Sequence, residues 1–396
     1  MSRTLTSLIE AQFPHLARLL GNRLGGREQE LERYGIAVLW QVEQDLELLE
    51  RRHHVAAAYR NLLRNPREFV QAAYEIRTAA MLAPIVDELE PGPRVGPRKC
   101  DLKCAFGDRG VFIEVTTRED PFPWTRPEWN EMRMTGRAVD AQVRARATVE
   151  RSYDRTTADH EVETREVSAT KEIRDLIQDK LRQLPENQLT VLVVGSQSVR
   201  CLDIELALFG DERSQMRSPG LIFREALPNG IFAIADEKLG GSKLSAVVWM
   251  KLAPRFSDIR VHSRLFTNPR ARRPMPPDVE DALVRVFDRR AVLTRELERI
   301  QPIILERYRP ERMVLFGSMV DTSGEHIHSA SDIDLFLVKS TPARYTDRVG
   351  EVLDLVEPRV GFNVIVYTPE ELAAAEREGN FFVREEILGR GQVLFP

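Results

Sequence analysis

Two aspartates separated by one residue, Asp332 and Asp334, form the sharpest chemical pattern in the sequence. They alternate with the apolar residues Ile333, Leu335 and Leu337. Side chains of a strand point to alternate faces, so both carboxylates are expected on the same face. Such a pair makes a hard oxygen site that suits Mg²⁺ or Mn²⁺. The pattern therefore predicts a metal site at the two aspartates.

A Gly-Ser pair, Gly317 and Ser318, ends a short apolar segment, and thirteen residues separate Ser318 from Asp332. Glycine allows close backbone approach, serine offers a hydroxyl, and the N–H groups of a following helix can hold a phosphate. A phosphate site beside a metal pair is what in-line transfer of a nucleotidyl or phosphoryl group requires. The alternative is structural: Asp332 ends a strand and Asp334 faces solvent.

The Gly-Ser pair followed by Asp-x-Asp resembles the minimal nucleotidyltransferases of the DNA polymerase β superfamily. The resemblance covers about residues 300–396, including the segments 368–372 and 386–394. It implies a nucleoside triphosphate, expected to be ATP, bound at Gly317 and Ser318, with Asp332, Asp334 and Ser318 in the catalytic site. It implies transfer of a nucleotide, expected to be AMP, to a hydroxyl of a protein or nucleic acid. Such domains serve in toxin–antitoxin and phage-defence systems.

The third carboxylate of that family corresponds here to Asn363. An amide can ligate Mg²⁺ but is a poor base, so the substitution weakens both the metal site and activation of the acceptor hydroxyl. It favours nucleotide binding over rapid turnover. The spacer is also longer than the family's and holds His326 and His328, which we interpret as loop residues rather than metal ligands.

A second set of acids, Glu75, Asp101 and Glu114, lies near the N-terminus. Two strands, expected at about 99–105 and 111–117, would form a hairpin that brings Asp101, Lys103, Glu114 and Thr116 onto one surface. A register slip of one residue would separate them. Glu75 belongs to a helix expected over about 67–83, from which it can reach the same surface.

This set resembles the PD-(D/E)xK pattern of the restriction-endonuclease-like superfamily over about residues 66–278. The resemblance implies that Asp101 and Glu114 hold Mg²⁺ and that Glu75 assists them. The family's lysine is replaced by Thr116, and Lys103 is a candidate surrogate. The alternative is a degenerate or structural domain, with Asp101 paired to Lys103 or Arg109 and Glu75 on a wet helix face beside Arg77.

These elements predict an α/β (α+β) chain in four parts: a helical extension (1–65), a restriction-endonuclease-like mixed-sheet domain (66–278), a linker helix (279–312) and a small nucleotidyltransferase domain (313–396). The charged stretch 131–183 is expected to be helical, with a surface break at 156–168. Further strands are expected at 189–195, 244–250, 313–316, 333–338 and 362–367, and a helix at 369–377.

Composition narrows the class of protein further. The chain has 396 residues, a net charge of −4 and three cysteines, which excludes a globally basic coat protein and a disulfide framework. Without a long apolar run or a signal peptide, a cytoplasmic protein with no membrane contact is expected, and a homo-oligomer is allowed. Basic residues that either line a phosphate-binding surface or form a solvated face are Arg264, Arg270, Arg272, Arg273, Arg285, Arg289 and Arg290. Trp124 and Trp129 either stack on bases or plug an apolar edge.

Three functional hypotheses follow from these motifs. The first is an Mg²⁺-dependent nucleotidyltransferase fused to a nuclease-like domain. The second is a metal-dependent DNA or RNA endonuclease whose C-terminal domain senses nucleotides. The third is a catalytically degenerate protein that binds nucleotide or nucleic acid, because both sites lack one expected group: Asn363 and Thr116 stand in their places.

Overall fold

The computed structural model describes the chain in ranges, which are 12–20, 28–65, 68–118, 158–196, 199–210, 212–218, 221–226, 229–233, 241–255, 258–321 and 326–396. The protein is a mixed α/β structure with two main sheets. It divides into two compact units. Unit 1 comprises residues 1–259 and 265–282, and unit 2 comprises residues 260–264 and 283–396.

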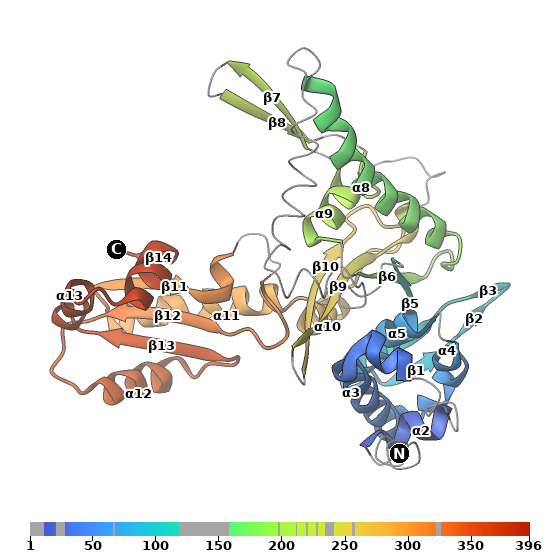
Figure 1. Ribbon diagram of the computed structural model, residues 1–396, viewed down its shortest axis with the longest axis horizontal. Helices are drawn as coiled ribbons and strands as arrows, with labels where there is room; N and C mark the ends of the chain where they lie inside the picture. The colour runs from blue at the N-terminus through green and yellow to red at the C-terminus, as the bar shows by residue number, and fades with distance from the viewer. Residues whose placement is uncertain are drawn as a thin grey trace. The chain divides into compact units, whose positions relative to one another are not determined.

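The main sheet of unit 1 has six strands in the order β1-β4-β5-β6-β9-β10 (Figure 1). Its antiparallel edge is formed by β1 against β4 and by β4 against β5, whereas β5, β6 and β9 run parallel. The strands are β1 (Glu88–Pro91), β4 (Leu102–Phe106), β5 (Arg109–Thr117), β6 (Leu189–Gly195), β9 (Ala246–Arg255) and β10 (Asp258–Thr267). Two short hairpins lie outside this sheet, β2 (Arg94–Val95) with β3 (Arg98–Lys99) and β7 (Glu212–Ser218) with β8 (Leu221–Ala226).

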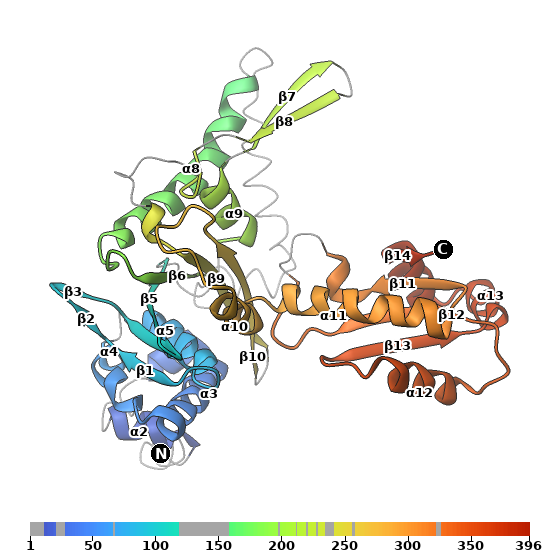
Figure 2. The same ribbon diagram turned by 180° about the vertical axis from the view of Figure 1, so that it is seen from behind.

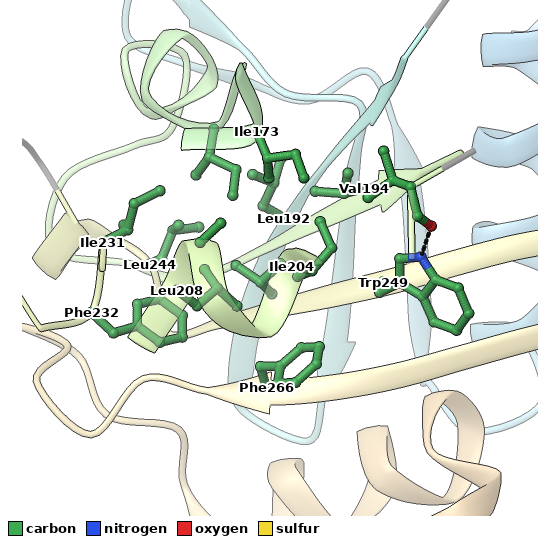
Figure 3. Close-up of a cluster of buried hydrophobic side chains, with 14 of the residues drawn as sticks. Ile173, Leu192, Val194, Ile204, Leu208, Ile231, Phe232, Leu244, Trp249 and Phe266 are labelled. Atoms are coloured by element: carbon green, nitrogen blue, oxygen red, sulfur yellow. Dashed lines mark hydrogen bonds between the residues drawn. The ribbon is translucent and has the colours of Figure 1, made fainter. Parts of the chain in front are cut away.

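The helices of unit 1 are α2 (Pro14–Leu20), α3 (Glu28–His53), α4 (Arg60–Arg64), α5 (Phe69–Leu82), α8 (Ala158–Leu181) and α9 (Cys201–Phe209), with 3₁₀ turns at Ala56–Tyr59 and Gly241–Lys243. Helix α10 (Pro277–Phe287) contains residues of both units. Helices α8 and α9 cover one face of the sheet. Their apolar side chains pack with Leu192, Val194 and Trp249 of the sheet in one buried cluster (Figure 3). The Trp249 indole donates to the Val199 carbonyl at 2.9 Å, which satisfies its buried N–H.

Helix α5 packs against the opposite face of β6. A Cβ at Gly195 would overlap the ring of Tyr74, which is 1% exposed, so glycine is required there for the close approach of helix and strand. This packing fixes α5, and with it Glu75, relative to the sheet.

Two sequence expectations for unit 1 are wrong in detail. The predicted break at 156–168 does not interrupt α8, which runs through 24 residues without glycine or proline. The predicted strand 99–105 is split, because Cys100 and Asp101 leave the sheet between β3 and β4. There the Cys100 N–H donates to the Pro93 carbonyl, and the Gly92 N–H donates to the Asp101 carbonyl. Residues 119–157, which include Trp124 and Trp129, lie outside the described ranges.

Unit 2 is built on a four-stranded sheet in the order β13-β12-β11-β14 (Figure 2). Its strands are β11 (Arg312–Phe316), β12 (Ile333–Val338), β13 (Phe362–Tyr367) and β14 (Gln392–Phe395). Strand β12 is antiparallel to β11 and parallel to β13. One buried cluster covers each face of the sheet, and Leu335 and Phe336 belong to opposite clusters, as strand alternation requires.

The helices of unit 2 are α11 (Arg289–Ile303), α12 (Tyr345–Val356) and α13 (Pro369–Arg377), with a 3₁₀ turn at Gly317–Val320 and π-helical turns at Ile304–Tyr308 and Phe382–Gly389. The expected linker helix (279–312) is not one continuous helix, because it is interrupted at Asp288. This residue ends α10, and its side chain caps α11 by accepting from the Ala291 N–H at 2.9 Å.

Within the described ranges, every helix is too short or too polar to cross a bilayer.

Candidate functional site

Three polar residues of unit 2 meet at one edge of its sheet. Asp334 on β12 lies opposite Phe316, the residue before Gly317, in the antiparallel pairing with β11. On its other side Asp334 is in register with Asn363 of β13. Asp332 directly precedes β12. The sheet therefore brings the Gly317 turn, both aspartates and Asn363 together, as the motifs predicted.

Each aspartate of this acidic pair lies directly against a glycine. A Cβ at Gly317 would overlap Oδ2 of Asp334, and a Cβ at Gly361 would overlap Oδ1 of Asp332. Gly317 also has a φ of 75°, a backbone conformation that L side chains rarely adopt. Instead of the expected longer helix, a single 3₁₀ turn follows, in which Ser318 is half-buried.

Asn363 acts as a hydrogen-bond donor to the acidic pair. Its Nδ2 is 2.9 Å from Oδ1 of Asp334 and 3.4 Å from Oδ2 of Asp332. The pKa of Asp334 is raised, chiefly by burial and further by the charge of Asp332, while the hydrogen bond from Asn363 opposes the shift. The Asn363 amide therefore offsets part of the electrostatic repulsion between the two carboxylates, which both approach its Nδ2.

Arg289, the first residue of α11, supports this site from outside the predicted nucleotidyltransferase segment. Its Nε and Nη2 donate to the Ser331 carbonyl at 3.0 and 2.7 Å, which holds the backbone directly before Asp332. Burial lowers the pKa of Arg289, and the nearby charge of Asp332 raises it. The guanidinium therefore both positions Asp332 and supplies a positive charge beside it.

The donor set of this site fits one Mg²⁺. Mg²⁺ in proteins is commonly held by one or two carboxylates together with waters and substrate phosphates. Asp332 and Asp334 converge on one donor group, and Asp334 is destabilised as an anion by burial and by its neighbour. Among the described residues no three His, Cys, Asp or Glu side chains gather as a metal site, and here the third position is the amide of Asn363.

The acids predicted in unit 1 also come together. Glu75 on α5, Asp101 before β4 and Glu114 on β5 interact electrostatically with one another. The pairing of β4 with β5 sets Lys103 opposite Phe112. The register slip that would separate the predicted residues is therefore absent from this pairing. By strand alternation, one face is assigned to Asp101, Lys103, Glu114 and Thr116.

Burial dominates the ionisation of this acidic cluster. It raises the pKa of Glu75 to about 8 and that of Glu114 to about 7, with the charge of Asp101 adding to both. Burial also raises the pKa of Asp101, although its Oδ2 accepts from the Val115 N–H at 2.8 Å. Gln71 donates to Glu75 at 2.9 Å and to the Val115 carbonyl at 2.6 Å. The carboxyl groups of this cluster therefore tend to stay protonated, and a bound cation would displace those protons.

The lysine that reaches this cluster is Lys180, on α8. Its Nζ is 3.0 Å from Oε1 of Glu114, whose side chain is 2% exposed. Oε2 of Glu114 is buried and has no hydrogen-bond partner among the residues that the structure describes. Lys103, the surrogate considered from sequence, extends instead toward Glu90, at 3.9 Å, and the ring of Phe112.

Among the described residues, the neighbours of this cluster pair differently from what the structural alternative expected. Thr116, at the family's lysine position, is 3% exposed on β5. Arg109 pairs with Asp278 rather than with Asp101. Arg77 pairs with Asp45 at 2.7 Å, and Glu75 is half-buried rather than on a wet helix face.

Sequence reasoning missed Lys180, Gln71 and Arg289 as site residues. Lys180 lies 66 positions from Glu114, so no local motif joins them. The contact between Gln71 and Glu75 could have been predicted, because Gln71 lies one helical turn before Glu75. Arg289 was counted only as part of a basic stretch.

No protein-family model matches the sequence, and a search of curated proteins finds no similar protein.

Proposed function

We propose that unit 2 binds a nucleoside triphosphate together with Mg²⁺ and transfers its nucleotidyl group to a hydroxyl. The observation that supports this most directly is the convergence of Asp332, Asp334 and Asn363 beside the Gly317 turn. A carboxylate pair beside a tight glycine turn matches what in-line transfer needs, a cation and a close backbone approach for the phosphates.

In this proposal the acceptor oxygen bonds to the α-phosphorus while the bond to the pyrophosphate oxygen breaks, and pyrophosphate leaves. Asp332 and Asp334 hold the cation, which when bound stabilises negative charge on the phosphates. Asn363 cannot take the proton of the acceptor hydroxyl. The proton of the acceptor hydroxyl is released to solvent water, because both aspartates are occupied as ligands of the cation. Arg289 keeps Asp332 in place through Ser331.

The test is transfer from ATP labelled at the α-phosphate, with the protein itself, a cell extract and bulk RNA as acceptors. We expect Mg²⁺-dependent labelling that disappears in the double variant Asp332→Ala, Asp334→Ala. The matched control is Asp347→Ala, Asp354→Ala, which removes the same charge from exposed positions on α12. Labelling that survives in the first double variant, or that is absent in the native protein, contradicts the proposal.

We infer a second candidate function for unit 1, metal-dependent cleavage of a phosphodiester. The observation that favours it is Glu114, a buried carboxylate with one oxygen bound by Lys180 and the other without a hydrogen-bond partner in the described part of the chain. Asp101 and Glu114 are the residues that would hold the cation. Lys180 would take the role that the PD-(D/E)xK pattern gives to its lysine, which is to hold the attacking water or the phosphate.

Nicking of a supercoiled plasmid in the presence of Mg²⁺ or Mn²⁺ tests this second function. Glu114→Gln should abolish nicking, whereas Glu88→Gln, an exposed acid on β1, should not. The double variant of Asp332 and Asp334 should leave nicking unchanged. If Glu114→Gln retains full nicking, the cluster is not the catalytic centre.

A further inference from the structure

A basic hairpin leads directly into the acidic cluster of unit 1. Strands β2 and β3 carry Arg94, Arg98 and Lys99, and the segment 91–100 contains no acidic residue. Three prolines and two glycines with positive φ, Gly92 and Gly96, shape its turns. The hairpin projects from unit 1 in both views (Figures 1 and 2).

The hairpin places like charges directly opposite each other. Arg94 pairs with Lys99 across the two strands, and both side chains are exposed. Directly opposed like charges destabilise a pair of strands. The arrangement therefore costs stability in the free protein, and a bound polyanion would remove that cost.

More basic side chains join the hairpin through the loop before β6. Arg98 donates to the Leu184 carbonyl at 2.8 Å and lies 3.5 Å from Glu186. Lys243 lies 3.1 Å from the same carboxylate, so two cations share one anion. Lys243, and after it Arg98, lower the pKa of Glu186. The exposed Arg273 donates to the Asn187 carbonyl at 3.2 Å, next along this loop.

We propose that this basic face, defined as Arg94, Arg98, Lys99, Lys243 and Arg273, binds the backbone of duplex DNA. The phosphodiester backbone carries regularly spaced negative charges, which would neutralise the opposed charges of Arg94 and Lys99. A two-stranded ribbon fits the major groove of B-form DNA, whereas the major groove of A-form RNA is too narrow for protein side chains to read. Duplex DNA is therefore the nucleic acid that this hairpin fits.

The basic face also connects to the carboxylates. Lys99 is close to Asp101 in the chain, and its side chain lies against Gly92, whose N–H donates to the Asp101 carbonyl at 2.8 Å. A DNA strand held by the hairpin would thus run beside Asp101. The inference deepens the second proposed function by naming its substrate and binding surface. It is tested without divalent cations, so that binding and cleavage can fail separately.

The experiment measures binding of the full chain to a labelled DNA duplex in EDTA across a salt series, by fluorescence anisotropy. The test variant is Arg94→Glu with Arg273→Glu. The control is Arg51→Glu with Arg60→Glu, which makes the same charge change at exposed positions in the helical region. The same series is run with duplex RNA of identical sequence and with polyglutamate.

We expect the native protein and the control to bind DNA, and the test variant to lose about tenfold in affinity at low salt. The slope of log affinity against log salt should fall by about two, because two phosphate contacts are lost. The thermal midpoint of Arg94→Glu alone should not fall, since it places opposite charges across the hairpin. The proposal is overturned by equal loss in the control, by duplex RNA binding as tightly as DNA, or by binding of polyglutamate.

Discussion

The substitution Asn363→Asp tests the electrostatics of the acidic site of unit 2, which comprises Asp332, Asp334 and Asn363. It replaces the amide that donates to Asp334 at 2.9 Å, and that lies 3.4 Å from Asp332, with a third carboxylate. Shape is nearly unchanged, so the effect is electrostatic. Without divalent cations the variant loses a donor and gains a like charge, whereas with them it gains a ligand.

The size of the effect follows from this geometry. A hydrogen bond to a charged group contributes about 1.5–3 kcal/mol. Two like charges about 4 Å apart repel by about 4 kcal/mol at an effective dielectric constant of 20. Asn363 is exposed, so solvent screening reduces both figures. We expect unit 2 to lose about 1–2 kcal/mol in EDTA, or roughly 5–10 °C in melting temperature for a domain of this size.

With Mg²⁺ present, the Asn363→Asp variant should become more stable than the native protein, although it is less stable in EDTA. A ligand at about one hundred times its dissociation constant stabilises the folded state by about 2.7 kcal/mol. The third carboxylate should therefore make the Mg²⁺-induced rise in melting temperature larger in the variant than in the native protein. Asn363→Ala is the control, because it removes the donor without adding charge, and it should be less stable than the native protein in both conditions.

The pH dependence in EDTA gives a second check. Repulsion among the three carboxylates of the variant opposes their ionisation in the folded state, and the unfolded chain does not impose this repulsion. The destabilisation is then fully present at neutral pH and is lost as the pH falls and the carboxylates take up protons. Calorimetric scans of the full chain measure both effects. Equal melting of variant and native protein in EDTA, or equal shifts with Mg²⁺, would refute the reasoning.

Three further predictions concern the neighbouring residues. Because the pKa of Glu75 is raised to about 8, the folded state holds a proton that the unfolded state releases, so the unfolding free energy should fall as pH rises from about 4.5 to 8. Glu75→Gln should flatten this slope in urea titrations at several pH values, and an unchanged slope would contradict the assignment. Lys180→Met leaves Glu114 buried without its cation and should cost about 2–4 kcal/mol, whereas adding Glu114→Gln should recover much of that loss. Arg289→Ala removes both donors to the Ser331 carbonyl and should cost about 1–2 kcal/mol. Arg289→Lys should restore part of this loss; equal melting of the two variants would show that the guanidinium contacts contribute nothing.

Short apolar runs were enough to predict the strands of unit 2. The predicted strands 333–338 and 362–367 coincide with β12 and β13, and each is an apolar run interrupted by a single polar residue, Asp334 or Asn363. Helix α13 was equally readable, since Thr368 and Glu371 form a capping box with a proline after the cap. Local patterns of this kind act over a few residues and need no tertiary context.

The chemical details depended on contacts that no local pattern contains. Asp101 leaves the sheet because its carbonyl and the Cys100 N–H bond to the β2–β3 hairpin, a pairing that alternation alone does not predict. Lys180 reaches Glu114 only after α8 packs on the sheet. The resemblance to the minimal nucleotidyltransferases predicted Asn363 at the third position. Its hydrogen bonds to both aspartates follow from the parallel register of β12 and β13.

The two glycines against the acidic pair have a consequence for how this sequence can change. A Cβ at Gly317 would overlap a carboxylate oxygen of Asp334, and a Cβ at Gly361 would overlap a carboxylate oxygen of Asp332. A single methyl group at either position displaces a carboxylate without altering any charge. Selection that keeps the aspartates must therefore keep the glycines. Among descendants of this sequence, the four positions should be retained together or lost together, as two steric pairs within one site.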